Sequence, residues 1–153
     1  MNRYFQTPPV VKNLIIINVL VYMATALLPV GDTIMQYCAL SLGTPYFHTY
    51  QFITYMFLHA NFMHLFMNMF ALWMFGRTLE YEMGSKRFLL YYMVTGIGAG
   101  LLQLGVTWIE VSSLHSAGAA GTASPYELAA RIGSVTIGAS GAVFGVLLAF
   151  GMM

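Results

Sequence analysis

Four long apolar segments alternate with shorter polar stretches along this chain. They cover residues 10–28, 62–81, 88–108 and 134–153. Each is about 20 residues long, the length that an α-helix needs to cross the hydrocarbon core of a bilayer. The first segment lacks a small-residue cleavage pattern and further spans follow it, so we expect it to be retained rather than removed as a signal peptide. The pattern predicts an all-α fold, a polytopic transmembrane helical bundle with four spans.

Two of the stretches between these segments are long. Residues 31–58 are apolar but interrupted by glycine, proline and polar side chains, which makes them too irregular to span a bilayer and too apolar for water. We expect them to form a first outer loop that is partly embedded in the membrane. Residues 110–133 are rich in Ser, Ala and Gly and contain Ser124-Pro125, so we expect an exposed loop there.

Composition supports the membrane assignment. Hydrophobic residues make up 59% of the chain and charged residues only 7%, against about 25% charged residues in an ordinary soluble domain. The net charge of +1 gives no reason to expect nucleic acid or an acidic partner. The single cysteine, Cys38, excludes a disulfide within the chain.

Basic residues at the ends of the segments predict the orientation. Arg131 lies alone on one side. The other side carries Arg3, Lys12, Arg77, Lys86 and Arg87. The positive-inside rule places the N-terminus and the turn between the second and third segments in the cytoplasm, and the two long loops outside. We expect a multi-pass integral membrane protein of the plasma (inner) membrane of a bacterium.

Polar side chains gather at the outer end of the second segment. His64 and Asn68 are four residues apart, so they share one face of a helix and could donate hydrogen bonds to one small acceptor. His59 lies about 140° around an ideal helix from His64, and we expect it at the end of the preceding loop. The two histidines lack the i, i+4 spacing of a zinc site and have no Cys, Asp or Glu at their depth. We therefore expect no metal and no cofactor.

Ser140 enters the fourth segment from the same outer side as His64. Three glycines surround it: Gly138, Gly141 and Gly145. On a helix these glycines would lie within about 60° of one another, a smooth strip for close packing against a neighbouring helix. A serine in such a strip can simply bond to its own backbone. A nucleophilic serine needs donors for an oxyanion and a general base, and the Ser140 amide, His64 and Asn68 could supply the donors.

These motifs resemble the rhomboid family of intramembrane serine proteases. The matching runs are His59-x4-His64-x3-Asn68, the series Gly76, Glu80 and Gly84, and Gly138-Ala139-Ser140-Gly141-x3-Gly145. The resemblance covers residues 10–153 and implies hydrolysis of peptide bonds in or near the transmembrane segments of other proteins. It implies Ser140 as the nucleophile, His64 and Asn68 as oxyanion donors, and His59 as an auxiliary residue that shapes the site.

The chain departs from the family in its number of helices. The family's core has six helices and takes its general base, a histidine, from the sixth, whereas four spans are expected here. The four histidines are His48, His59, His64 and His115. None occupies the place of the base, and His115 is the remaining candidate for a substitute. We interpret residues 1–153 as a single rhomboid-like domain that lacks its C-terminal part and is inactive alone.

Two other functions remain open. A non-catalytic rhomboid-like protein would bind transmembrane helices without cutting them. A small channel or transporter fragment would show a continuous polar stripe through several helices, whereas the polar residues here lie mainly at one depth. The expected partners are transmembrane protein substrates and the lipid bilayer, and the oligomeric state stays open.

Overall fold

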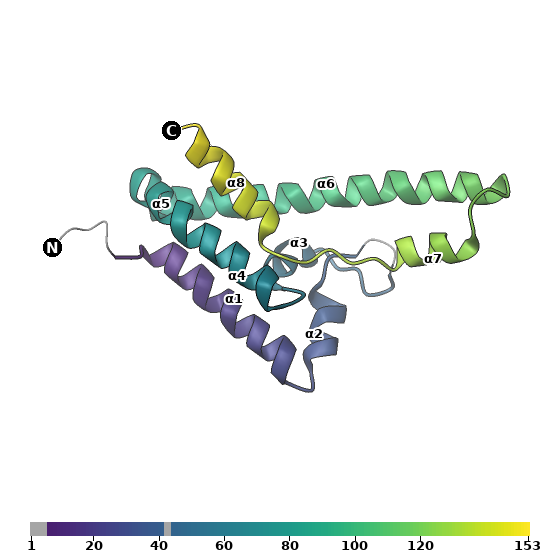
Figure 1. Ribbon diagram of the computed structural model, residues 1–153, viewed down its shortest axis with the longest axis horizontal. Helices are drawn as coiled ribbons and strands as arrows, with labels where there is room; N and C mark the ends of the chain where they lie inside the picture. Colours follow the sequence, from purple (N-terminus) through teal and green to yellow (C-terminus); the bar gives the residue numbers. More distant parts are fainter. Residues whose placement is uncertain (1–5, 42–43) are drawn as a thin grey trace.

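The computed structural model describes residues 6–41 and 44–153 and is built of helices (Figure 1). Arg3 and part of the first outer loop, residues 42–43, lie outside the described residues. The helices are α1 (Pro9–Leu27), α2 (Gly31–Cys38), α3 (Gln51–Thr54), the 3-10 helix η2 (Tyr55–Phe57), α4 (Phe62–Ala71), the π-helix η3 (Leu72–Gly76), α5 (Arg77–Met83), α6 (Ser85–Ala119), α7 (Pro125–Ile132) and α8 (Ser140–Gly151).

Within the described residues, two helices are long and apolar enough to cross a membrane, judged by length and composition. They are α1, with 19 residues, and α6, with 35. The helices α4, η3 and α5 follow one another directly and together cover residues 62–83. The last helix, α8, is apolar but has only 12 residues. The chain is therefore a helical bundle with two candidate spans and two further apolar helical stretches.

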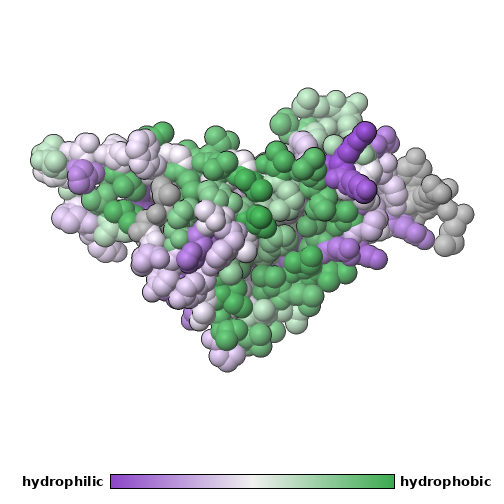
Figure 2. All heavy atoms as spheres, turned by 180° about the vertical axis from the view of Figure 1, so that it is seen from behind, coloured by the Kyte–Doolittle hydropathy of each residue, from purple (hydrophilic) through white to green (hydrophobic). Residues whose placement is uncertain are grey.

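Helix α6 is the common partner of five other helices. It packs against α1, α3, α5, α7 and α8. Its buried side chains include Phe88 and Tyr92, both with no exposed surface. Large apolar side chains are nevertheless exposed on most of the helices. Figure 2 shows such side chains along α1 and over the middle of the bundle, with hydrophilic groups gathered near the turn between α5 and α6. This outward display of apolar surface is what a membrane-embedded bundle requires.

The start of α1 is held by a carboxylate from α5. The first N–H groups of a helix have no partner within the helix. Here Glu80 accepts hydrogen bonds from the amides of Val10 at 3.0 Å and Val11 at 2.8 Å. The hydroxyl of Ser85 donates a third at 2.7 Å. Glu80 is 2% exposed, so its carboxylate supplies acceptors to amides that would otherwise lack a partner inside the bundle.

The first outer loop is more ordered than its sequence indicates. It contains α2, α3 and η2, where we expected irregular chain. The buried Gln51 side chain donates to the carbonyls of Tyr37 at 3.0 Å and Tyr46 at 2.8 Å, and its oxygen faces the amide of Ser41 at 3.4 Å. One amide side chain thus satisfies backbone groups on both sides of the loop, because an amide carries donors and an acceptor.

The prediction of a loop over residues 110–133 is wrong about its structure, although most of these residues are exposed. α6 continues to Ala119 and α7 turns back along it. Gly121, at φ 74°, ends α6 while the amide of Thr122 donates to the carbonyl of Ala117 at 2.9 Å, a common helix ending. Ser124 then caps α7 in a reciprocal pair with Glu127.

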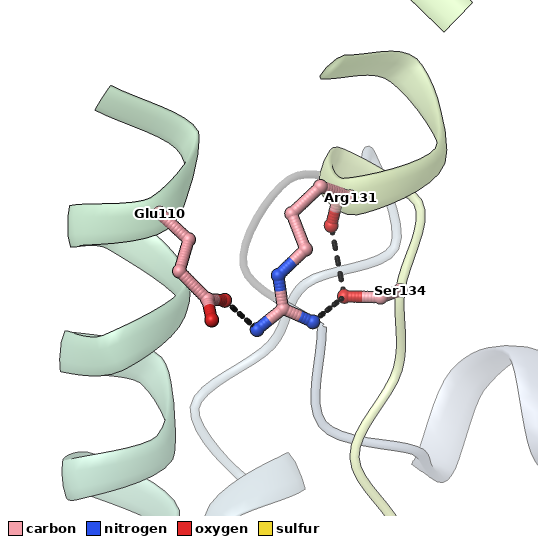
Figure 3. A network of polar contacts seen from close by, with 3 residues as sticks. All are labelled: Glu110, Arg131 and Ser134. Carbon is pink, nitrogen blue, oxygen red and sulfur yellow. Dashed lines mark hydrogen bonds and ion pairs between the residues drawn. The ribbon is translucent and has the colours of Figure 1, made fainter. Parts of the chain in front are cut away.

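An ion pair joins the two arms of this hairpin. Arg131, at the end of α7, pairs with Glu110 on α6 and donates to the hydroxyl of Ser134 at 3.3 Å (Figure 3). The side chains of Arg131 and Glu110 are 29% and 47% exposed, so the pair is screened by solvent and contributes little to stability. Its position nevertheless directs the chain from α7 toward α8.

The fourth apolar segment is not helical at its start. Residues 134–138 lie outside any helix, Ala139 forms a turn, and α8 begins only at Ser140. Thr136 forms an antiparallel bridge with Leu40 of the first outer loop, with N–O distances of 3.0 and 2.8 Å. The bridge satisfies backbone groups that a helix starting at residue 134 would have paired internally.

Candidate active site

Ser140 is the first residue of α8 and is half-buried. The preceding residue, Ala139, provides no side-chain cap, and the first paired amide of the helix is that of Val143, which donates to Ala139 at 2.9 Å. The amides of the first turn therefore lack partners within the helix. Unpaired amides and the positive end of the helix dipole favour negative charge beside Ser140.

Two glycines bring α8 against α6. A Cβ on Gly145 would lie 2.6 to 2.8 Å from the side-chain atoms of Thr95, and a Cβ on Gly141 would collide with Ala99. Tyr91 of α6 also donates to the carbonyl of Gly145 at 2.8 Å. The close approach of the two backbones sets the depth and rotation of α8, and with them the direction of the Ser140 hydroxyl.

Gly138 lies outside this strip, which corrects the sequence prediction. It precedes α8, adopts φ 117°, and donates its amide to the carbonyl of Tyr55 at 2.8 Å. A Cβ there would stand 2.7 Å from Cε1 and 2.8 Å from Nε2 of His64, and 3.7 Å from the hydroxyl of Ser140. The missing side chain thus leaves room for the imidazole, and the His64 ring and the Ser140 hydroxyl both lie within 4 Å of one point.

His64 sits in the first turn of α4 and is oriented from two sides. Its amide donates to the side-chain oxygen of Asn61 at 2.9 Å, a helix cap that fixes the start of α4. The ring of His59 packs against the His64 ring edge-on, with centroids 5.0 Å apart and planes at 66°. His59 lies between η2 and α4, at the end of the first outer loop, as the spacing predicted.

His59 is 2% exposed, and neither of its ring nitrogens has a hydrogen-bond partner among the described residues. It lines a cavity of about 130 Å³ between α1, α2 and the start of α4. The other lining residues are Tyr22, Thr25, Ala26, Met35 and Ala60. An unpaired imidazole beside a cavity of this size is suited to bind water.

Asn68 is buried one turn below His64, and its amide donates to the carbonyl of His64 at 3.0 Å. One amide hydrogen is thereby directed to the helix backbone rather than to Ser140. The second hydrogen remains for another acceptor, because a side-chain amide carries two. Asn68 therefore both stiffens the turn that carries His64 and offers one further donor.

The other two histidines lie elsewhere. His48 stacks on Tyr50 in the first outer loop, with ring centroids 5.2 Å apart. His115 lies at the far end of α6 and lines a cavity against α7. Within residues 6–41 and 44–153, no three His, Cys, Asp or Glu side chains are grouped closely enough to hold a metal ion.

Sequence reasoning missed the part played by Tyr55. Its hydroxyl donates to the carbonyl of Gly96 on α6 at 2.6 Å, and its own carbonyl accepts from Gly138. Its side chain is 3% exposed. Tyr55 therefore ties the first outer loop to α6 and to the chain entering α8. No periodicity marks it, since it lies in a single 3-10 turn.

The fold and the site define a helical membrane protein in which a serine and two histidines gather at one end of the bundle. The chain belongs to the rhomboid family, because the family model of the Rhomboid domain matches residues 46–153. This confirms the resemblance seen in the motifs. Family membership supports a rhomboid-like function within the membrane.

Three curated relatives were matched. Rhomboid-like protein 11, chloroplastic, of Arabidopsis thaliana is 37% identical over 97 residues, which cover 63% of this chain and 26% of the relative. Rhomboid protein 1, mitochondrial, of Saccharomyces cerevisiae is 38% identical over 96 residues, 61% of this chain and 22% of the relative. RHOMBOID-like protein 6, mitochondrial, of Arabidopsis thaliana is 43% identical over 53 residues, which cover 35% of this chain and 17% of the relative. The chain thus spans about a quarter or less of the length of these relatives.

The predicted location in a bacterial plasma membrane is wrong by this comparison. The matched relatives are chloroplastic or mitochondrial proteins, which points to organellar membranes instead. Composition and basic-residue counts place a chain in a bilayer and orient it, but they carry no information that separates one membrane of this kind from another.

Proposed function

We propose that this chain carries the nucleophile and the oxyanion-binding groups of an intramembrane serine endopeptidase that cleaves transmembrane segments of other membrane proteins. The observation that carries the proposal is the meeting of Ser140 and His64 at Gly138, where a single Cβ would contact both side chains. A packing serine would need no imidazole at this distance and no glycine at φ 117°.

In the proposed reaction the Ser140 oxygen attacks the carbonyl carbon of a peptide bond and passes its proton to a general base. The resulting oxyanion is stabilised by the unpaired amides at the start of α8, by His64 and by the second amide hydrogen of Asn68. Collapse expels the amine, which takes up the proton, and leaves an acyl-enzyme. Water then attacks the ester and releases the acid. His59 serves as an auxiliary residue that holds the His64 ring.

In this proposal, four spans position the site in the bilayer. We propose that residues 62–83 and the segment that ends in α8 join α1 and α6 as membrane-crossing elements, and that the first outer loop lies in the membrane beside them. At about 1.5 Å per residue, α6 is about 50 Å long and exceeds a hydrocarbon core of about 30 Å, so its end with α7 projects into water. Ser140 then lies below the surface at the same end as that hairpin.

We propose that the general base is a histidine of a later helix, outside residues 1–153, as the family resemblance implies. The structure engages His48 with Tyr50 and places His115 at the end of α6. Without a base, the rate falls by about 10² to 10⁴, the usual contribution of proton transfer to a positioned side chain. We therefore expect residues 1–153 alone to show no Ser140-dependent reaction.

The test begins with the reading frame downstream of the codon for Met153. The chain extended by the encoded residues is purified in detergent and supplied with a fluorescent transmembrane substrate. We expect cleavage, and Ser140→Ala is expected to abolish it while expression is unchanged. Ser112→Ala, an exposed serine on the projecting part of α6, is the matched control and should cleave normally.

Turnover by Ser140→Ala equal to that of the unmodified protein would refute the nucleophile assignment. Labelling of residues 1–153 by a fluorophosphonate, lost in Ser140→Ala, would refute the proposed origin of the base. A stop codon directly after Met153, with stable protein that binds transmembrane helices without cutting them, would favour the non-catalytic function.

A further inference from the structure

An aromatic ladder runs along the exposed side of α4 and η3. It consists of Phe62, Phe66, Phe70 and Trp73, which are 64%, 48%, 44% and 39% exposed. Successive ring centroids are 6.2, 5.9 and 6.3 Å apart, within the range of favourable aromatic pairs. The guanidinium of Arg77 lies at the end of the ladder, with its carbon 4.5 Å from the centre of the Trp73 ring.

The ladder faces away from the candidate active site. Phe66 and Phe70 are each two residues from Asn68, which places them about 160° around the helix from that buried side chain. The buried residues of this stretch, Leu65, Met69 and Leu72, lie on the Asn68 side. The stacked rings therefore contribute neither to the core nor to the site already described.

Among the described residues, Arg77 has no carboxylate partner. In the part of the chain that the structure describes, the ion pair is that of Arg131 with Glu110 at the opposite end of α6. A guanidinium held over a ring still has N–H groups directed away from the ring, and these match two oxygens of a phosphate. Lys86 and Arg87 are exposed at the same end of the bundle and add positive potential there.

We propose that the aromatic ladder and Arg77 form a binding site for an anionic phospholipid, with the phosphate on Arg77 and one acyl chain along the rings. The ladder extends over about 16 Å at 1.5 Å per residue, close to the acyl thickness of one leaflet, about 15 Å. The phospholipid would belong to the leaflet at the basic end of the bundle.

The chemistry of the ladder favours a lipid over a protein helix. Helices associate in membranes through small residues that allow their backbones to approach, whereas the ladder presents four large rings already packed on one another, two pairs stacked and one tilted. A second copy related by a two-fold axis along the membrane normal would place two unpaired Arg77 side chains at the same depth, where like charges oppose association.

Trp73 allows a direct test, because the chain has only two tryptophans. Trp108→Phe leaves Trp73 as the reporter within residues 1–153, and this protein is reconstituted into phosphatidylcholine vesicles. A small fixed fraction of the lipid carries brominated acyl chains, which quench tryptophan on contact. In one set of vesicles this brominated lipid is phosphatidylglycerol, and in the other it is phosphatidylcholine. We expect stronger quenching by the brominated phosphatidylglycerol at equal mole fraction.

Arg77→Gln is expected to lower the relative affinity for phosphatidylglycerol about five-fold, which corresponds to about 1 kcal/mol for one basic side chain at a membrane surface. Arg87→Gln is the matched control and should retain most of the preference, since Arg87 has no ring beneath it. Arg77→Lys keeps the charge without the planar edge and should fall between the two. Circular dichroism of each variant shows that the helices are retained.

Three results would overturn the proposal. They are equal quenching by the two brominated lipids, an equal loss of preference in Arg77→Gln and Arg87→Gln, and no quenching by either lipid, which would mean that a protein segment or a second copy covers the ladder. None of these measurements involves peptide cleavage. Their outcome is therefore independent of the proposed protease function.

Discussion

Glu80→Ala tests how the start of α1 is held to the rest of the bundle. Pro9 has no amide hydrogen, and the amide of Lys12 already donates to the carbonyl of Pro8 at 3.0 Å. The amides of Val10 and Val11 therefore depend on Glu80, at 3.0 and 2.8 Å. Removing the carboxylate leaves two donors of the first turn without partners at a buried contact between α1 and α5.

The expected loss of stability follows from these contacts. An unsatisfied buried donor costs about 1–3 kcal/mol. Val11 is completely buried and takes the upper part of that range, whereas the half-buried Val10 can turn toward water and takes the lower part. We expect Glu80→Ala to lower the free energy of unfolding by about 3 kcal/mol and Glu80→Gln, which keeps one acceptor oxygen, by about half as much.

Unfolding in mixed detergent micelles, followed by circular dichroism as the fraction of denaturing detergent rises, measures this difference. Glu82→Ala is the matched control, because Glu82 lies two residues away on α5 and is exposed. An exposed substitution of this kind changes stability by no more than about 0.5 kcal/mol. Equal stability of the Glu80→Ala and Glu82→Ala proteins would refute the view that Glu80 holds the start of α1.

Two further predictions concern the chain around α7 and α8. Gly138→Ala should lower the free energy of unfolding by about 1–3 kcal/mol, because alanine is strained at φ 117° and its Cβ would press on the His64 ring. Gly98→Ala is the control, because a Cβ at Gly98 on α6 would meet open space. Equal unfolding midpoints of the two variants would contradict the prediction. Hydrogen bonds from the Ser124 backbone, and then from its side chain, hold the pKa of the Glu127 carboxyl below its usual value. Because the folded pKa is lowered, this contribution to α7 is complete above pH about 4.3 and is lost as the pH falls through the folded pKa. Ser124→Ala keeps the backbone donor but removes the hydroxyl, so it should raise the Glu127 pKa in an NMR titration, and an unchanged pKa would show that the Ser124 side chain contributes nothing.

Local patterns predicted the helices where one physical requirement dominated. Length and apolar content placed helices within residues 10–28 and 88–108, because a span needs about 20 apolar residues whatever its neighbours are. The hairpin of α6 and α7 was missed because small polar residues were interpreted as a loop. The sequence does contain residues typical of helix ends in this region. Gly121 ends α6, and the pair Ser124 and Glu127 caps the start of α7.

The candidate site was predictable only in part. The spacing of His64 and Asn68 predicts both on one turn of a helix. It does not predict that the Asn68 amide donates to the His64 carbonyl, because the amide could reach other acceptors. The start of α8 at Ser140 was not predictable from hydropathy, since residues 134–139 are as apolar as a helix would require. Thr136 instead pairs with Leu40 in an antiparallel bridge, and the helix starts only after it.

By itself, the sequence determined that this is a helical membrane protein of the rhomboid family, because hydropathy, segment length and motif spacing are properties of neighbouring residues. The tertiary structure alone decided which distant groups meet. Gly138 receives the ring of His64 from α4, Tyr55 joins the outer loop to α6, and Glu80 completes the start of α1. Each contact links residues more than 40 positions apart, and such pairs are set by how the helices pack rather than by any local pattern.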